Sequence, residues 1–471
     1  MNHTIVTDNR AEDDIILTPQ QQQIVDNDSE EQLVRGIAGS GKTLVLLKKA
    51  KKKALKNADD TVMILTYATS LTNASQITMR RYGLGNLDVR TVHAWTMKLY
   101  GQIFSGSYRL IKGSDQTNLV KRAISLTKID HRFVKDESYV EFLQKEISFI
   151  KGMEIRTMSE YAAVSRRGRG ASTRVTATDR EVIYEIFWNY ENLKGKNRDF
   201  DDFAYKLLNV KDRIPETAKL DHVFVDEAQD LQLSQIRLLK KCVRKTITIA
   251  ADKGQKIYDT AFSWREAGLN IQGGRTKILK DSHRSTRQII ELAVSLQQND
   301  SITQDEEYVV PVLPERTGYK PVLRRFDDKV RHDEAVLTMI NEILKESPAA
   351  TIGILSRWSH GRVHRLGGKL SRKGIPYTDV REKQDVDPFS PGVKFSTFHS
   401  AKGLEFDVVL IVDLIDPTIL PTEEDASEYW DNERRLLYVA MTRAKSLLYM
   451  LSYETENRLL LEMDSKLYDI H

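Results

Sequence analysis

Clustered carboxylates at the end of an apolar run mark the first candidate site in this chain. The segment VFVDEAQD brings Asp226, Glu227 and Asp230 side by side, where a buried strand would end. Carboxylates this close repel one another, and such a group usually holds a cation or manages a proton. The alternative is the start of a helix, where acidic side chains face the positive end of the helix dipole.

A glycine-rich segment near the N-terminus decides between these two interpretations. The stretch VRGIAGSGKT matches the spacing GxxxxGK[ST] and contains Gly36, Ala38, Gly39, Ser40, Gly41, Lys42 and Thr43. Glycines let the backbone curl so that successive N–H groups face an anion. Lys42 can neutralise phosphate charge, and the hydroxyl of Thr43 can bind Mg²⁺. A strand-like EQLVRG precedes the loop and a helix-like LVLLKKAKKKALK follows it, which is the context that a phosphate-binding loop requires.

Together the two segments predict an ATP site. Mg²⁺ would be held between Thr43 and Asp226, the carboxylate at the end of another strand. Glu227 lies next to that aspartate, placed to orient or deprotonate a water molecule against the terminal phosphate.

The composition limits the class of protein. A chain of 471 residues can bury several cores, so we expect more than one domain. The net charge of +4 is small, so a surface for a polyanion must be a local patch. The single cysteine, Cys242, excludes an intramolecular disulfide and favours a reducing, cytoplasmic location. No uncharged apolar run approaches the roughly 20 residues of a membrane span, and we expect the polar residues 1–14 to be a loose leader.

Strand-like runs separated by helical patterns predict an α/β fold. One set begins near residues 61, 222 and 245, and a second set begins near residues 277, 350, 392, 407 and 446. Such alternation is typical of parallel sheets covered by helices on both faces, and two sets predict two lobes that meet at a cleft. We expect a first domain of residues 1–100 and 215–275, interrupted by a mainly helical insertion at 101–214, and a second domain at 276–471.

Several separate signatures then occur in the order of one known family. They are LTPQQQQIV, GIAGSGKT, ILTYATS, TVHAW, VDEAQD, GQKIY…FSWREAG, SHRSTRQI, TFHSAKGLEFDVV and RRLLYVAMTRAK. The chain therefore resembles the superfamily 1 helicases of the UvrD/Rep/PcrA type, from Leu17 to Lys445. The resemblance implies two RecA-like P-loop domains, an ATP- and Mg²⁺-dependent motor, and DNA as its partner.

The same resemblance assigns further residues to the nucleotide. Gln255 would contact the γ-phosphate and the attacking water, although a glutamine in DKGQK is also an ordinary turn residue. Arg284 and Arg443 would reach across from the second lobe and stabilise the charge of the transferring phosphoryl group. Surface ion pairs are the alternative role for these two arginines. Glu405, in GLEF, would contact the ribose.

The base pocket has one candidate ligand and two departures from the family. Gln21 would read the adenine edge, but Thr18 to Gln21 also reads as a helix capping box. His283 stands where the family usually has a tyrosine that stacks on adenine, and Leu44 stands where an arginine often follows the loop threonine. These departures put the choice of nucleotide in question, and they leave hydrolysis unaffected.

A path for single-stranded DNA needs positive charge and aromatic faces on which bases stack. The family motifs place eight candidates along such a path, namely Tyr67, His93, Trp95, Trp264, Arg265, Arg357, Thr397 and His399. Taken singly, each aromatic residue is more often part of a core than a stacking platform, but motif position favours the platform for Trp264 and supports it for Tyr67. Two acid-free basic stretches, with arginines at 166, 167, 169 and 174 and with six Lys/Arg between 356 and 378, add candidate phosphate contacts.

The chain lacks space for one part of the longer relatives. They carry a second insertion, the 2B domain, before the TFHSAKG motif, whereas only residues 381–392 are available here, too few for a folded domain. The resemblance implies a 3′→5′ translocase on single-stranded DNA and at junctions, in repair or phage defence. Because the insertion is missing, we expect its unwinding to be weak or to depend on a protein partner such as a nuclease. The alternative is a nucleotide-switched DNA-sensing subunit of a larger complex. A metabolic P-loop kinase would need neither HSAKGLEF nor two arginines from a second lobe.

Overall fold

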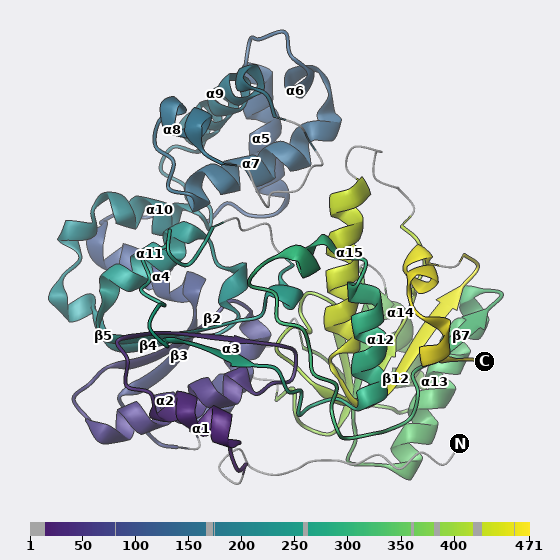
Figure 1. The fold of residues 1–471 in the computed structure, drawn as a ribbon. Helices are drawn as coiled ribbons and strands as arrows, with labels where there is room; N and C mark the ends of the chain where they lie inside the picture. Colours follow the sequence, from purple (N-terminus) through teal and green to yellow (C-terminus); the bar gives the residue numbers. More distant parts are fainter. Residues whose placement is uncertain are drawn as a thin grey trace.

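Two parallel sheets, each covered by helices, form the body of the molecule, and a helical bundle projects from the first (Figure 1). The computed structural model describes residues 15–80, 82–165, 173, 175–257, 262–358, 362–380, 387–417, 426–455 and 457–471. The expected leader, the arginines of 166–174 and residues 381–386 of the shortened insertion lie outside these ranges. None of the helices in the described ranges combines the length and apolar composition needed to cross a membrane.

The first sheet has the strand order β3-β2-β4-β5-β1-β6, and all of its neighbouring strands are parallel. Its strands are β1 (Glu31–Gly36), β2 (Val62–Thr66), β3 (Leu87–Thr91), β4 (Leu220–Val225), β5 (Val243–Ala251) and β6 (Thr276–Leu279). Every residue of β2 is buried, as expected for a strand with helices on both faces. One face is covered by α1 (Pro19–Asp26) and α2 (Lys42–Lys56), and the other by α4 (Val92–Ile103), α10 (Asp202–Asn209) and α11 (Leu233–Cys242). Beside β3 lies α3 (Thr69–Arg80).

Two predicted domain boundaries shift in the structure. The strand β6, which the sequence analysis assigned to the second domain, pairs with β1 along Leu33↔Thr276 to Gly36↔Leu279. The first domain therefore extends beyond residue 275. The helix α10 was assigned to the insertion, but Phe203 and Leu207 on this helix pack into the core of the first domain. Pairing and packing partners decide both cases, and neither is visible in a local sequence pattern.

The insertion is a helical bundle with its own core. It comprises α5 (Ser114–Leu126), α6 (Arg132–Lys135), α7 (Val140–Gly152), α8 (Met158–Ala163) and α9 (Ala177–Lys194). Apolar side chains from α5, α7 and α9 form this core, which includes Leu143, Ile147, Ile183 and Ile186. The bundle stands above the first sheet in Figure 1, joined to it where α7 and α9 end close to α10 and α11.

The second sheet has the strand order β13-β7-β12-β11-β8-β10-β9, again with parallel neighbours throughout. Its strands are β7 (Val322–Phe326), β8 (Thr351–Ser356), β9 (Tyr377–Asp379), β10 (Gly392–Thr397), β11 (Phe406–Ile411), β12 (Ala444–Tyr453) and β13 (Asp469–Ile470). Helices α12 (Arg287–Gln297) and α15 (Ala426–Met441) cover one face, and α13 (Lys329–Glu346) and α14 (Arg362–Arg372) cover the other. Two doubly covered parallel sheets confirm the predicted α/β fold.

The topology places the loops with chemistry at one edge. The phosphate loop follows β1, the carboxylate cluster follows β4, and Asp252 follows β5, and these three strands are neighbours in the order β4-β5-β1. Ligands of open parallel sheets bind at the carboxyl ends of the strands, where the following loops meet. The second domain contributes to the same place through the segments that follow β6 and β10 and through the start of β12.

Candidate nucleotide and nucleic-acid site

The phosphate loop adopts the strained backbone that its glycines permit. Gly39 has φ +73° and Gly41 has φ +83°, both in the left-handed region. A β-carbon at Gly39 would lie 2.7 Å from the β-carbon of Arg284, and the Gly39 carbonyl accepts a hydrogen bond from the backbone N–H of His283 at 2.9 Å. The loop therefore needs a glycine here, both for its own curl and for close contact with the segment that follows β6.

The ammonium group of Lys42 lies inside the loop. It donates hydrogen bonds to the carbonyl oxygens of Gly36 at 3.1 Å and Ile37 at 2.7 Å, and it contacts Asp252 at 3.1 Å. All three partners are oxygen atoms with negative charge or partial negative charge. The phosphate oxygens of a nucleotide have the same chemistry, so this cation is suited to bind them.

Thr43 and Asp226 meet as the sequence predicts for a magnesium site. The Thr43 hydroxyl donates to Oδ2 of Asp226 at 2.6 Å. Burial, followed by the charge of Glu227, raises the pKa of Asp226 to about 6. A hydroxyl and a carboxylate at one point are the ligands that Mg²⁺ takes beside phosphate oxygens, and a cation there would favour the ionised aspartate. The residues present thus fit the ion.

Glu227 is buried yet held in its charged form. Burial opposes ionisation, but Lys402 and Lys42 outweigh it and lower the pKa of Glu227. Gln229 donates a hydrogen bond to Oε2 of Glu227 and so fixes its orientation. The backbone of Glu227 has φ +53°, a conformation that is uncommon for a side chain of this kind. An ionised, oriented carboxylate is what the predicted role as a base for water requires.

Lys402 is a residue of this site that the sequence analysis did not single out. It lies in the segment after β10 and is almost fully buried against the first domain. Its ammonium group donates to Oδ2 of Asp230 and, at 2.6 Å, to the backbone oxygen of Gln255, and it lies 3.6 Å from Oε2 of Glu227. Burial raises the pKa of Asp230 to about 6. The motif HSAKGLEF contains Lys402, but the sequence does not indicate which carboxylate it contacts.

Gln255 connects the two domains through its side chain. Its Nε2 donates to Asp252 at 2.6 Å, and its Oε1 accepts a hydrogen bond from Arg443 at 2.8 Å. Arg443 is only 1% exposed and also donates to the backbone oxygens of Val439 and Leu404. Burial, then the charge of Arg284, lowers the pKa of Arg443 to about 9, and a nearby anion would relieve this cost.

Arg284 and Glu405 lie at the same seam and bind each other. The Arg284 Nε donates to Oε2 of Glu405 at 2.7 Å, and Lys445 lies 3.2 Å from the other carboxylate oxygen. Burial opposes ionisation of Glu405, but the two cations outweigh it and lower its pKa to about 2. Arg284 is in contact range of the phosphate loop, as the Gly39 geometry shows.

The predicted base pocket is partly occupied by local hydrogen bonds. The capping box is present, because Thr18 Oγ1 accepts from the Gln21 N–H and Gln21 Oε1 accepts from the Thr18 N–H. Gln21 Nε2 also donates to the backbone oxygen of Ser40 at 3.1 Å. The side chain of Gln21 thus contacts the phosphate loop, and its contact with adenine stays a prediction. His283 is exposed beside this loop.

Three aromatic rings come together beyond the carboxyl ends of β2 and β3. The rings of Tyr67 and His93 have centroids 5.9 Å apart, and those of His93 and Phe200 lie 5.1 Å apart, both pairs edge to face. Burial lowers the pKa of His93 to about 4, so its ring is neutral. Phe200 is 37% exposed and was absent from the predicted path. We call Tyr67, His93 and Phe200 the aromatic cluster.

Both predicted tryptophan platforms lie in the core. Trp95 is 4% exposed and Trp264 is 5% exposed, and both belong to the apolar core of the first domain. Trp264 packs edge to face on Phe262, with ring centroids 5.6 Å apart. Neither ring offers a free face for a base in this conformation. Both tryptophans are therefore core residues here, which is the alternative role given for them above. The neighbouring Arg265 is exposed.

The predicted contacts of the second domain lie near its own carboxyl edge. Arg357 forms an ion pair with Glu433 and lies over the ring of Trp358, which is 42% exposed. The Thr397 hydroxyl accepts a hydrogen bond from the Ser400 N–H at 3.1 Å. Burial, followed by the charges of Arg357 and Lys402, lowers the pKa of His399 to about 4. Arg357 is therefore neutralised locally, and Trp358 adds an exposed aromatic ring next to it.

The fold and the site define a two-domain protein whose phosphate loop lies at the seam between the domains. Family comparison agrees, because the UvrD/REP helicase N-terminal domain matches residues 17–273 and the UvrD-like helicase C-terminal domain matches residues 380–455. The chain belongs to the UvrD-like helicases of superfamily 1.

Individual relatives are similar at low identity. A probable DNA helicase II homologue from Mycoplasma capricolum is 25% identical over 393 residues, which cover 77% of this chain and 52% of the relative. A probable DNA helicase from Mycoplasma pneumoniae is 21% identical over 486 residues, covering 94% and 84%. DNA helicase IV from Escherichia coli is 24% identical over 509 residues, covering 94% and 69%. This chain thus spans about half the length of the first of these relatives and more of the other two.

Proposed function

We propose that this chain is an ATP-dependent DNA helicase that moves 3′→5′ along single strands. One observation carries the proposal above the others. Arg443 of the second domain bonds to Gln255 of the first at 2.8 Å, and Gln255 in turn bonds to Asp252, the partner of Lys42. Groups from both domains therefore converge on one phosphate site, which is the arrangement needed to couple hydrolysis to domain movement.

The residues suggest a sequence of roles. Lys42 and the loop N–H groups bind the phosphates, and Thr43 and Asp226 would hold Mg²⁺, which supplies positive charge beside the phosphate oxygens. Glu227 orients the attacking water and accepts its proton. Arg284 and Arg443 stabilise the negative charge of the transferring group when the domains close. Loss of the terminal phosphate removes the anion that both arginines bind, so the domains separate.

The surface for DNA is proposed at the carboxyl edges of both sheets. The aromatic cluster offers base-stacking faces in the first domain, and Arg265, which belongs to the FSWREAG motif, is exposed. Thr397, His399 and Arg357 would face the same strand from the second domain. Alternate closing and opening of the domains would then move the DNA contacts of one domain relative to those of the other.

We further propose that unwinding is weak without a partner. Strands β9 and β10 are parallel neighbours, paired along Val393↔Tyr377 to Phe395↔Asp379. A connection between parallel neighbours needs about a dozen residues to return the chain, and the sequence between these two strands consists only of residues 380–391. No length is left there for the 2B domain of the longer relatives. A nuclease or another repair or defence subunit is the partner class that we propose, in a cytoplasmic setting.

One set of assays tests the proposal. The ATPase rate of the chain is measured with single-stranded DNA, duplex DNA and RNA, followed by strand displacement from substrates with 3′ or 5′ tails. We expect stimulation by single-stranded DNA and displacement from 3′ tails only. An ATPase rate that DNA does not change would contradict the proposed motor function. Processive unwinding of long duplexes by the chain alone would contradict the proposed dependence on a partner. ATP-dependent DNA binding without movement would favour the DNA-sensing subunit.

A further inference from the structure

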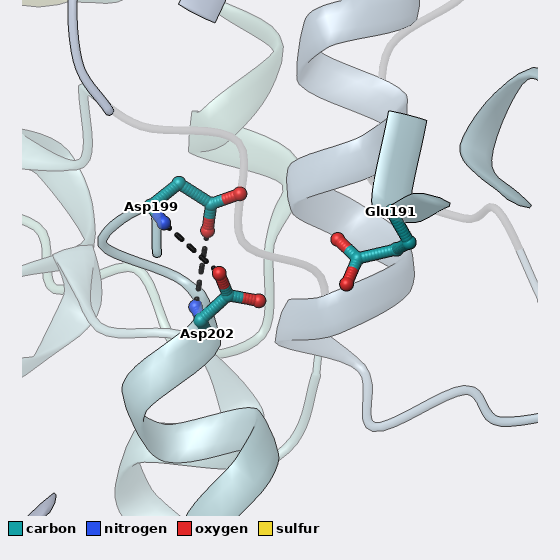
Figure 2. A group of neighbouring side chains, drawn as sticks. All are labelled: Glu191, Asp199 and Asp202. Atoms are coloured by element: carbon teal, nitrogen blue, oxygen red, sulfur yellow. Dashed lines mark hydrogen bonds between the residues drawn. The ribbon is translucent and has the colours of Figure 1, made fainter. Parts of the chain in front are cut away.

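A buried group of charges lies where the insertion joins the first domain. The carboxylates of Glu191, Asp199 and Asp202 lie close together, with ligand oxygens within 4.8 Å of one another (Figure 2). Such a group could hold a metal ion, but two ammonium groups already fill it. Lys151 and Lys194 each contact all three carboxylates. We call these five residues the ion cluster.

The ion cluster joins parts of the chain that belong to different cores. Lys151 lies in the last turn of α7, and Glu191 and Lys194 lie in the last turn of α9. These three residues therefore come from the insertion. Asp199 and Asp202 belong to the turn that starts α10, which packs into the first domain. Both lysines and both aspartates are 2% exposed or less, so water does not weaken their attraction.

The two aspartates also close the turn between them. The Asp199 N–H donates to Oδ2 of Asp202 at 2.9 Å, and the Asp202 N–H donates to Oδ1 of Asp199 at 3.1 Å, as the dashed lines of Figure 2 show. The side chain of Asp201 is fixed as well, because Gln232 donates to its Oδ1 at 3.0 Å. Phe200 is the most exposed residue of the turn 199–202, at 37%, while Asp201 is half-buried and both Asp199 and Asp202 are buried.

Phe200 is therefore held by its neighbours on both sides. Its ring lies 5.1 Å from that of His93, which contacts Tyr67 in turn. Four buried charged groups and the half-buried Glu191 cost desolvation energy, and an apolar core would stabilise the same junction at least as well. Beyond stability, such a network of hydrogen bonds and ion pairs holds the residues that it joins in one geometry.

We infer that the ion cluster is a positioning device for DNA binding, which fixes the turn 199–202 and so holds Phe200 in the aromatic cluster. This inference rests on the proposed function, because it gives the aromatic cluster a role in binding single strands. The five residues act through Phe200 and do not touch the DNA themselves.

Asp202 offers the sharpest test. Asp202→Ala removes the acceptor of the Asp199 N–H and one partner of each lysine, whereas Asp202→Asn keeps a side-chain oxygen for the N–H. Tyr161→Phe is the matched control, because it removes a buried hydrogen bond to Glu146 in the core of the insertion, away from the turn. Thermal unfolding first shows which variants are folded at the assay temperature, and if Asp202→Ala is not, Lys194→Gln takes its place.

The measured quantity is the oligo(dT) concentration that half-stimulates the ATPase. We expect Asp202→Ala to raise it roughly tenfold, comparable to the loss of one base stack by Phe200→Ala. Asp202→Asn should restore most of the affinity, and Tyr161→Phe should leave it unchanged. In the double variant Phe200→Ala/Asp202→Ala the two effects should not add, because they act through one ring.

Two results would overturn the inference. Additive effects in the double variant would show that Asp202 acts by another route, and an unchanged half-stimulating concentration in Asp202→Ala would show that the turn does not depend on the ion cluster. A wild-type chain whose ATPase ignores oligo(dT) would instead overturn the proposed function. The two failures are therefore distinct.

Discussion

The guanidinium group of Arg443 donates a hydrogen bond to the side-chain oxygen of Gln255 across the domain seam, at 2.8 Å. The arginine is 1% exposed and lies in the turn between α15 and β12, while the glutamine follows β5. A guanidinium buried at the edge of a phosphate site is a source of positive charge that is already desolvated. Its contact with Gln255 links the domain that supplies this charge to the side chain proposed to sense the terminal phosphate.

Arg443→Lys should therefore lower kcat for ATP by about 10³-fold, because a point charge cannot replace the fork of donors that Arg443 offers. The KM for ATP should change much less, since the phosphate loop binds the nucleotide. Steady-state ATPase assays with saturating single-stranded DNA measure both constants. Arg434→Lys is the control, because Arg434 is paired with Glu462 and Asp431 on α15, away from the seam. Equal losses in the two variants would point to a structural effect alone.

Lys42→Ala and Glu227→Gln should both abolish turnover but leave different states. Without the Lys42 ammonium the phosphates lose a cation inside the loop, so nucleotide binding should weaken. Glutamine at 227 keeps the size of the side chain and loses the base, so ATP and single-stranded DNA should stay bound. Equilibrium binding of a fluorescent oligonucleotide with and without ATP separates these outcomes. An equal loss of ATP-dependent DNA affinity in both variants would contradict the assigned roles.

Lys402→Met should lower kcat, because the Lys402 ammonium group contacts the carboxylate of Glu227 and the backbone oxygen of Gln255. Removal of its ammonium leaves the buried carboxylates of Glu227 and Asp230 without a shared cation, so they repel and protonate more readily. We expect a loss of about tenfold or more, the size of a single misplaced catalytic group. Lys402→Arg keeps the charge and should retain more activity than Lys402→Met. A methionine variant with the wild-type kcat would exclude a role in positioning.

The local motifs of the nucleotide site could be predicted from sequence because their geometry is local. The loop at Gly39 and Gly41 needs glycine whatever surrounds it, and the strand before it and helix after it carry their own patterns. Thr43 and Asp226 follow β1 and β4, two parallel strands on either side of β5, and their side chains meet because the loops at the carboxyl ends of such strands share one edge of the sheet.

The remainder depends on tertiary packing. Thr276–Leu279 reads as a strand from sequence, but only its pairing with β1 shows which sheet it joins. Trp264 lies in a motif of the DNA path and yet is buried, because an aromatic ring fits either place. Asp199, Asp202 and Lys194 look like ordinary surface charges of helices until the fold brings them together.

The half-buried His93 should make the stability of the chain depend on pH. In the unfolded chain a histidine binds a proton below about pH 6.5, whereas burial lowers the pKa of His93 in the folded state to about 4. Between these values the unfolded state binds more protons, so stability falls as the pH falls through this window. His93→Gln removes one such group and should reduce the loss between pH 7.5 and 5 by about 1–2 kcal/mol. Urea unfolding at the two pH values measures this change in the free energy of unfolding. The control is His283→Gln, because His283 is exposed. A loss of stability that His93→Gln leaves unchanged would show that His93 can be protonated in the folded chain.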